Sequence, residues 1–478
     1  MLNCLVVTNM RRKIFVIALF VLAFVTAFAQ SDEYGIPQIK NFGPADYRQE
    51  SQNFCVVQDK NSLMYFGNTN GVMEYDGEHW PIVKVPGRPK LAVNDNNEIY
   101  YGGYNTFGRI IYKNGHLDLD EISNNLDCAF GQIVKVVASN DAVYFASSDK
   151  LFMYANSNIK TIIDSKPFRL IDLDGSAYVQ RRFAPLQHLN HGKLETDELC
   201  SAVDSIDVAD LTKDKDNRII IRDGQRTCFF SYSKSEGLNY FRTEFDRYIN
   251  KNEYSKMAVL RDGTFVVGTK LGGIVSFDEH GKARFMVNTS NGLKDNSIND
   301  IYVDNQNKVW VATENGIGLL ETNSGLSIFN SSNGLRGAVL SVIRFNGILY
   351  VGTTVGLFKH YRLETPAGTL YGFRSIRGVY ENCWQLCIYD NHLYAVTSGG
   401  LFDIEEGNAE KVMDGSLISM MPITIGENKY VLLGGHHGII FTTISEGKIE
   451  KIGNMKNMMR TVRTIDRHRR QCMARYRP

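Results

Sequence analysis

Two pairs of histidines are the residues whose type and spacing come closest to metal chemistry. His188 and His191 are three residues apart, and His436 and His437 are adjacent in a turn that follows two glycines. A zinc site needs further ligands, and neither pair has a cysteine or carboxylate partner at a recognisable spacing. We therefore expect these histidines to lie in turns or on the surface, and we predict no metal site.

Three clusters of aspartate and asparagine resemble calcium loops in composition, at 94–97, 214–217 and 304–307. They lack the regular alternation of ligands and the distal glutamate that a calcium loop requires. Short polar side chains of this kind bond their own backbone and tolerate left-handed angles, which closes a tight turn. These clusters are therefore predicted to be hairpin turns.

Motifs of nucleophilic, phosphate-binding and zinc-dependent enzymes are absent from the sequence. There is no Gly-x-Ser-x-Gly, no Gly-Lys-Ser/Thr loop and no His-Glu-x-x-His. We predict no catalytic residue, no cofactor and no enzymatic activity. One alternative stays open, a polysaccharide lyase or glycosidase whose carboxylates come together from distant parts of the chain.

Aromatic side chains near predicted turns could stack against sugar rings, with planar polar groups beside them. The candidates are Trp80, Tyr104, Phe107 and Trp384, with Arg109 and Arg182 near them in the sequence. Packing between neighbouring repeats is the favoured explanation of each aromatic residue. The ligand-binding residues are therefore left unknown.

Charge and cysteine content exclude two further classes of protein. The 53 basic and 52 acidic residues give a net charge of +1, so we expect no binding of nucleic acid through this region. Six of the eight cysteines lie between residues 30 and 465, without the spacing of a metal site or a disulfide framework. They are Cys55, Cys128, Cys200, Cys228, Cys383 and Cys387.

The first 29 residues have the pattern of a secretory signal peptide. A basic cluster at 10–13 precedes an apolar run at 14–28, and Ala27-Phe28-Ala29 has the small-x-small form of a cleavage site. The run is shorter than the roughly 20 residues of a membrane helix, so a retained anchor is the weaker alternative. We expect an exported, periplasmic protein.

A repeat of about 41 residues organises the rest of the chain. Each copy has a polar turn, an aromatic or β-branched run, a small pair, a glycine and a second apolar run. Equivalent points are Tyr65, Tyr100, Tyr144, Tyr178, Ile220, Phe265, Trp310, Tyr350, Tyr394 and Tyr430. This pattern is typical of strands joined by tight turns, so we predict an all-β fold.

Four-stranded repeats of this length predict a β-propeller. One small sheet cannot bury both of its faces, and a ring of four to eight sheets solves that problem. Ten copies exceed one ring. We predict a seven-bladed first propeller over 35–375, followed by the start of a second, truncated propeller over 376–465.

Two stretches of the repeat resemble a known family. SNGL at 290–293, NSINDIYVD at 296–304, VWVAT at 309–313 and GIGL at 316–319 resemble the two-component regulator propeller repeat. Residues 54–80 are similar to the first blade of the triple-tyrosine-motif sensors of Bacteroidetes. The resemblance covers essentially the whole chain after the leader, and it is weakest over 160–250.

The resemblance implies the N-terminal part of a sensor of glycans or related small ligands. Such a sensor has periplasmic propellers, a small β-sandwich, a membrane helix and a cytoplasmic kinase or DNA-binding output domain. We therefore expect contact with a membrane only through the signal peptide or a C-terminal part absent here. A homodimer is expected only of the full-length, inner-membrane-anchored parent.

Residues 466–478 are abruptly basic and depart from the repeat. Reading the codons of Met473 and Ala474 one base later forces a tryptophan codon, and allowed codons around it spell Asn-Val-Trp-Leu-Gly-Thr, the motif of a further blade. We interpret this tail as the product of a frameshift that truncated a longer sensor. The alternative is a genuine basic tail that contacts phosphates or a membrane.

Overall fold

The computed structural model describes residues 35–476 except 127, 140, 165–166, 183, 366–367, 406, 446–447, 456–460 and 469–470. The predicted signal peptide at 1–29 lies outside these residues. The described chain forms ten four-stranded antiparallel sheets and one two-stranded sheet, which confirms the predicted all-β class. Within this part of the chain no helix is both long enough and apolar enough to cross a membrane.

The first seven sheets are blades 1 to 7. Blade 1 contains β2 (Asn53–Gln58), β3 (Met64–Asn68), β4 (Gly71–Tyr75) and β5 (Ile82–Val83). Blade 2 contains β6 (Lys90–Val93), β7 (Ile99–Gly102), β8 (Phe107–Lys113) and β9 (His116–Glu121). Blade 3 contains β10 (Lys135–Ala138), β11 (Val143–Ala146), β12 (Leu151–Ala155) and β13 (Asn158–Ile163). Blade 4 contains β14 (Phe168–Leu173), β15 (Ser176–Arg181), β16 (Gln187–Asn190) and β17 (Lys193–Glu195). Blade 5 contains β18 (Val208–Lys213), β19 (Ile219–Asp223), β20 (Phe229–Ser233) and β21 (Gly237–Phe241). Blade 6 contains β22 (Tyr254–Val259), β23 (Phe265–Thr269), β24 (Ile274–Phe277) and β25 (Ala283–Val287). Blade 7 contains β26 (Ile298–Val303), β27 (Val309–Thr313), β28 (Gly316–Glu321) and β1 (Gln38–Phe42).

Three further sheets and a hairpin follow, and we call them the second array. They are β29 (Val339–Phe345), β30 (Ile348–Thr353), β31 (Gly356–Thr365) and β32 (Gly368–Ser375); β33 (Cys383–Tyr389), β34 (His392–Thr397), β35 (Gly400–Glu405) and β36 (Asn408–Asp414). Then come β37 (Leu417–Ile425), β38 (Asn428–Gly435), β39 (Gly438–Ser445) and β40 (Lys448–Asn454), and the hairpin of β41 (Val462–His468) and β42 (Gln471–Tyr476). The described helices are short: α2 (Pro44–Tyr47), α3 (Glu198–Ala202), α4 (Asp246–Lys251), η1 (Ser123–Asn125) and η2 (Ser331–Asn333).

In blades 1, 2, 5 and 7 the first turn begins with an aspartate or asparagine at the end of the first strand. Asp304 Oδ1 accepts hydrogen bonds from the backbone N–H groups of Gln306 (2.9 Å) and Lys308 (2.8 Å), and Asp304 Oδ2 accepts one from Trp310 Nε1 (2.9 Å). Asn307 has a φ of 64°, in the left-handed region that asparagine tolerates. The side chains of Asn94 and Asp214 accept the same pair of backbone bonds, two and four residues further on. The prediction that 94–97, 214–217 and 304–307 are hairpin turns is confirmed.

The second turn of blade 7 depends on a threonine and a glycine. Thr313 Oγ1 donates to the carbonyl of Gly316 (2.9 Å) and accepts from the backbone N–H of Asn315 (3.1 Å). Gly316 has a φ of 113°, and a Cβ atom there would lie 2.6 Å from the carbonyl oxygen of Phe42. Only glycine fits this position, which explains its recurrence in the sequence repeat.

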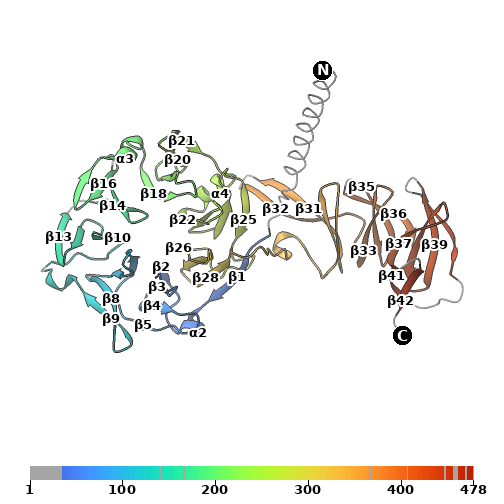
Figure 1. Ribbon diagram of the computed structural model, residues 1–478, viewed down its shortest axis with the longest axis horizontal. Helices are drawn as coiled ribbons and strands as arrows, with labels where there is room; N and C mark the ends of the chain where they lie inside the picture. Colours follow the sequence, from blue (N-terminus) through green and yellow to red (C-terminus); the bar gives the residue numbers. More distant parts are fainter. Residues whose placement is uncertain are drawn as a thin grey trace, which may run out of the picture. The chain divides into compact units, whose positions relative to one another are not determined.

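Seven blades form a closed ring (Figure 1). The first strands contact one another in the order β2, β6, β10, β14, β18, β22 and β26, and β26 contacts β2 again. Closure comes from β1, which pairs antiparallel with β28 from Gln38 opposite Glu321 to Phe42 opposite Ile317. The start of the described chain thus supplies the fourth strand of blade 7.

The predicted boundary at residue 375 is wrong, although seven blades were expected. The ring is complete at Glu321, and the sheet of β29 to β32, which the prediction included in the first propeller, belongs to the second array. A local repeat motif marks each blade but does not show which blade pairs with a distant strand. The sequence repeat therefore could not show at which residue the ring closes.

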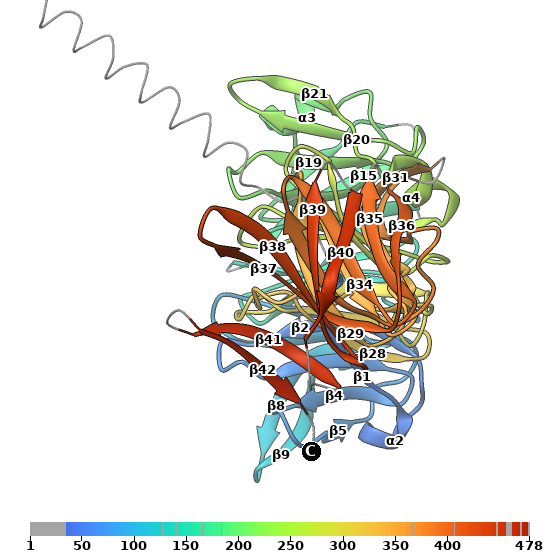
Figure 2. The ribbon, with the colours of Figure 1, turned by 90° about the vertical axis from the view of Figure 1, so that its right-hand side faces the viewer.

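The second array continues the same meander of strands. Its first strands contact in the order β29, β33, β37 and β41, and Figure 2 shows β41 and β42 beside β37 and β38. The array begins at Val339 rather than at the predicted residue 376. Backbone pairing continues into the basic tail at 466–478, because β41 and β42 pair from Val462 opposite Tyr476 to His468 opposite Gln471. Strand pairing uses backbone groups, which a basic sequence supplies as well as an apolar one. The frameshift interpretation of this tail stays a prediction.

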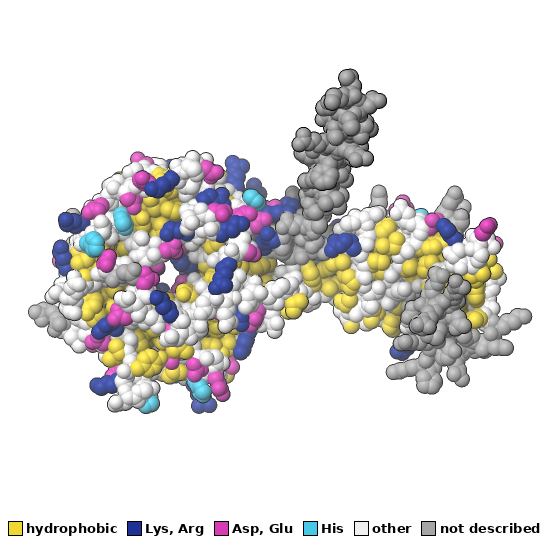
Figure 3. All heavy atoms as spheres, in the orientation of Figure 1, with side chains coloured by type: hydrophobic (Ala, Val, Ile, Leu, Met, Phe, Trp, Pro, Cys, Tyr) yellow, Lys and Arg dark blue, Asp and Glu magenta, His cyan; other side chains and the backbone are white. Residues whose placement is uncertain are grey.

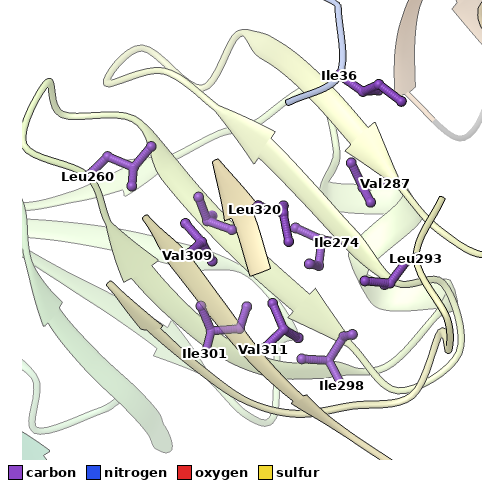
Figure 4. Close-up of a cluster of buried hydrophobic side chains, with 11 residues drawn as sticks. Ile36, Leu260, Ile274, Val287, Leu293, Ile298, Ile301, Val309, Val311 and Leu320 are labelled. Carbon is purple, nitrogen blue, oxygen red and sulfur yellow. The ribbon is translucent and has the colours of Figure 1, made fainter. Parts of the chain in front are cut away.

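The core lies between neighbouring blades. Figure 4 shows the cluster between blades 6 and 7, where Ile274 and Val287 of blade 6 face Ile298, Val309 and Leu320 of blade 7. All five are fully or almost fully buried. Each such side chain contributes about 1.5–3 kcal/mol when it is removed from water. The stability of the ring therefore depends on every blade having a neighbour on both faces.

We expect replacement of Phe42 by alanine to destabilise the ring by about 3–5 kcal/mol, because it removes a buried ring from the closing strand. Phe42 is 5% exposed and lies 5.4 Å from the ring of Trp80 and 5.9 Å from that of Trp310. These are two of the three tryptophans of the chain, so tryptophan fluorescence during urea unfolding reports on closure. Gln38→Ala, on an exposed position of the same strand, is the control and should change stability by less than about 0.5 kcal/mol. Equal effects of the two substitutions would contradict closure through β1.

Candidate functional site

Charged residues occupy one level of the channel that the seven first strands surround. This level corresponds to one position on the first strand, which lies opposite the same position of the second strand in every blade. It is filled by Cys55, Lys90, Lys135, Arg169, Asp210, Lys256 and Asp300. Six of these seven residues carry a charge, although first strands otherwise consist largely of apolar residues. We call this set the charged level.

A tightly paired lysine and aspartate link blades 5 and 6 at the charged level. Lys256 Nζ lies 2.8 Å from Oδ1 and 3.0 Å from Oδ2 of Asp210, and the hydroxyl of Tyr254 donates to Asp210 Oδ2 (2.6 Å). Burial alone lowers the pKa of Lys256, but the nearby carboxylates of Asp210, Asp300 and Asp172 raise it above its ordinary value. Burial, and then the charge of Asp210, raises the pKa of Tyr254 well above its usual range. The pair is thus held in its charged state.

Two other members of the charged level bond the open backbone edge of blade 1. Asp300 Oδ2 accepts a hydrogen bond from the N–H of Val56 (3.1 Å), and Lys90 Nζ donates to the carbonyl oxygen of Phe54 (2.8 Å). Asp300 Oδ1 also accepts from the N–H of Ile301 (3.0 Å). First strands have one edge facing the channel without a neighbouring strand, and these side chains satisfy part of it.

Lys135 differs from the other cations of the charged level. Within the described part of the chain it has no hydrogen-bond or ion-pair partner, whereas Lys90, Arg169 and Lys256 each have one. Its side chain is half-buried and lines a cavity of about 640 Å³ in the channel. Figure 3 shows the ring hollowed at its centre, with basic and acidic side chains beside the hollow. Lys135 is therefore available to a ligand.

Carboxylates outnumber cations around this channel cavity. The charged lining residues are Asp95, Asp141, Asp172, Asp174, Asp300, Lys135 and Lys256. Asp172 accepts a backbone bond from Gly175 (2.9 Å), and Asp174 lies 2.9 Å from Lys213 Nζ. Five carboxylates against two ammonium groups make the cavity negative. It can accept hydrogen bonds from hydroxyl groups, and Tyr302 adds an aromatic side chain to its wall.

The aromatic residues singled out in the sequence do not come together. Trp80 stacks on Tyr75, with ring centroids 4.1 Å apart, and Phe107 is fully buried. These two residues pack in the core. Tyr104 and Trp384 are 55% and 36% exposed, but neither is among the described residues that line the cavity.

Arg109 and the histidines are also engaged in local structure. Arg109 pairs with Glu98 (2.8 Å) and Asp120 (2.7 Å) of its own blade. The ring of His188 stacks on Tyr178 with centroids 4.9 Å apart. Of the other three histidines in the two pairs, His191 has a φ of 44°, in the left-handed region that is typical of turns. His436 Nδ1 lies 3.3 Å from the hydroxyl of Thr461, and His437 is exposed. In the part of the chain that the structure describes, no three metal-ligating side chains gather at one point.

The charged level was missed in the sequence, although a signal for it exists. In every blade of the ring its residue lies four positions before the residue that begins the first turn, as Asp300 does before Asp304 and Lys90 before Asn94. Aligning the repeats on that turn, rather than on the aromatic centre of the second strand, would have placed the charges in one column.

Comparisons with known proteins agree with the fold. Residues 292–315 match the two component regulator propeller family, which confirms the predicted resemblance. The extracellular domain of the hybrid two component system BT3049 from B. thetaiotaomicron has a TM-score of 0.59 at 14% identity. The match covers 89% of this chain, which spans only 61% of that domain. No curated protein sequence matches the chain.

Two other solved structures match with lower TM-scores. The extracellular domain of the one component system BT4673 from B. thetaiotaomicron has a TM-score of 0.47 at 16% identity, covering 92% of this chain and 65% of that one. Virginiamycin B lyase from Staphylococcus aureus has a TM-score of 0.45 at 12% identity, covering 59% of this chain and 98% of the lyase.

A double-mutant cycle on Lys256→Met and Asp210→Asn tests the link between blades 5 and 6. Each single substitution should lower the free energy of unfolding by about 1–3 kcal/mol, because it leaves a partly buried charge or polar group without its partner. The double variant should recover at least about 1 kcal/mol of the summed loss. Lys213→Met, which breaks the exposed pair with Asp174, is the control and should cost about 0–1 kcal/mol. If urea unfolding shows that the two losses of free energy are strictly additive, Lys256 and Asp210 are not coupled.

Alkaline pH should weaken the same link. The pKa values of Lys256 and Tyr254 are raised in the folded chain, so folding favours their protonated forms. Their contribution is complete below the unfolded pKa values near 10 and is lost as pH rises through the folded values. The melting temperature of the wild-type chain should therefore fall between about pH 9 and pH 11, and that of a Lys256→Met/Tyr254→Phe variant should fall less. If circular dichroism shows that the melting temperatures of the two proteins fall in parallel as pH rises, this assignment is refuted.

Proposed function

We propose that this chain, a propeller with the two-component regulator repeat, is the ligand-sensing region of an exported regulator. The ligand is a glycan fragment or a related polyhydroxylated small molecule, and it binds in the channel cavity without being transformed. The observation that carries this proposal is the cavity itself, in which carboxylates, a tyrosine and a lysine without a partner among the described residues surround a space of about 640 Å³. This size lies within the range of about 300–1,000 Å³ that is usual for small-molecule sites.

The charges of the cavity favour a neutral ligand rich in hydroxyl groups. Carboxylate oxygens accept hydrogen bonds from hydroxyls, and Lys135 can donate to a ring or glycosidic oxygen. The excess of carboxylates disfavours an anion in the same space. Asp95 and Asp141 are exposed at the turn ends of blades 2 and 3, where they can meet a ligand that enters the channel.

Export to the periplasm and transmission of the signal belong to the same proposal. The predicted signal peptide and the fold shared with extracellular domains of bacterial regulators support an exported location. Signal output would come from a membrane-anchored, dimeric parent protein that carries a kinase or DNA-binding domain. Nucleic acid would be contacted only by that output domain, not by the propeller.

A propeller lyase or glycosidase is the alternative, and one observation favours it. Five carboxylates gather in one cavity, as a glycosidase that uses an acid and a base would require. Three of them are already engaged, however: Asp300 and Asp172 accept backbone hydrogen bonds, and Asp174 pairs with Lys213. Among the described residues of the lining, this leaves Asp95 and Asp141 as a catalytic pair. The non-enzymatic function therefore has the stronger support.

A glycan screen of the purified chain, followed by calorimetry and product analysis of each hit, separates the two functions. We expect binding with no product, and a loss of affinity of at least about fivefold in Lys135→Met, because one hydrogen bond from a charged donor is lost. Lys160→Met, an exposed lysine on the outer strand of the same blade, is the matched control and should bind as the wild type does.

Turnover of a hit would reject the sensor function. If Asp95→Asn and Asp141→Asn then abolished turnover while binding persisted, the enzymatic alternative would be established. Binding that is unaffected by Lys135→Met would place the ligand outside the channel cavity.

A further inference from the structure

A second hollow of about 940 Å³ lies between blades 4 and 5, and we call it the arginine groove. Arg169, Arg181 and Arg182 line it, together with Asp204 and Asp207. It shares no lining residue with the channel cavity. Its formal charge is positive, whereas that of the channel cavity is negative, so the two spaces select different ligands.

A buried glutamine, Gln180, connects the two blades that form the arginine groove. Gln180 is 6% exposed, accepts a hydrogen bond from the N–H of Val208 (2.6 Å) and donates one to the carbonyl of Ile206 (2.8 Å). Beside it, Arg169 Nη1 donates to the carbonyl of Val208 (2.6 Å) and contacts Asp207 Oδ1 (3.1 Å). These bonds connect blade 4 to blade 5, so the groove is formed before any ligand arrives.

Arg181 has no such partner among the residues that the structure describes. It follows Gln180 on β15, opposite Phe168, and its Nε atom is buried without a hydrogen bond in the described part of the chain. Leaving a buried donor of a charged group unsatisfied costs free energy, and a bound acceptor would remove that cost. Asp207 is already occupied by Arg169, which leaves Asp204 as the one other acid in the groove lining.

We propose that the arginine groove binds a small molecule that bears a carboxylate. A planar carboxylate can accept two parallel hydrogen bonds from one guanidinium group, which suits Arg181, and Arg182 adds a second positive charge at the rim. Gln225 of blade 5 lines the opposite side and can bond a neighbouring hydroxyl. This site is separate from the channel cavity and goes beyond the ligand proposed for that cavity.

A matched pair of disaccharides tests the proposal on the full chain, because cellobiuronic acid differs from cellobiose by one carboxylate. By calorimetry, the acid should bind more tightly than cellobiose, and added salt should weaken its binding. Arg181→Met should reduce the affinity for the acid at least about tenfold, and Arg181→Lys should reduce it less. Arg226→Gln, an exposed arginine that pairs with Asp223 outside the groove, is the control and should bind as the wild type does.

Three results would overturn the proposal: equal affinity for the two sugars, binding of the acid that survives Arg181→Met, or binding that is lost in Lys135→Met instead. The last result would place the carboxylate in the channel. If the melting curve shows that Arg181→Met unfolds the chain, Arg181→Lys is used alone. A weakened affinity for the acid then supports the proposal, and an unchanged affinity overturns it. Failure of neutral glycans to bind the channel does not affect this test, because it follows the acidic sugar alone.

Discussion

A four-stranded blade is too small to shield both of its faces from water, and the rest of this structure depends on that constraint. Each blade is stable only with a neighbour on either side, so the row of sheets closes when the last blade meets the first. Closure is completed by β1, which joins residues near positions 40 and 320 through five paired residues. The aromatic cluster around Phe42 and Trp310 lies at this junction. A closed ring in turn creates the channel in which charges from six of its seven blades lie at one level.

Local features of this fold could be read from the sequence, and non-local ones could not. The turn at Asp304 and the glycine at 316 are visible because their hydrogen bonds join residues a few positions apart. The ring boundary depends on β1, whose residues carry no copy of the repeat, so the eighth repeat at Tyr350 was assigned to the wrong propeller. The strand β42 shows the same limit, since its pairing with β41 uses backbone groups that composition does not reveal.

The candidate site was hidden for a related reason. Lys90, Lys135 and Asp300 are far apart in the chain, and none of them belongs to a motif of known chemistry. Symmetry brings them to one level of the channel, where position in the repeat rather than residue type decides what a ligand meets. Aromatic residues such as Trp80 and Phe107 were candidates for ligand binding in the sequence, but they pack in the hydrophobic core. In repeat proteins of this kind, the informative comparison is between equivalent positions of successive blades.

Hydrogen exchange of the closing strand tests the central claim most directly, because every other feature of the ring requires that strand to be paired. Mass spectrometry of peptides that cover β1 should show backbone amides at 38–42 protected to the same extent as those of β25, the outer strand of blade 6. The linker at 322–327, which contains no strand, should exchange rapidly and serves as the internal reference. If β1 exchanges as fast as that linker, the ring is open at blade 7, and the channel site built on its closure is contradicted.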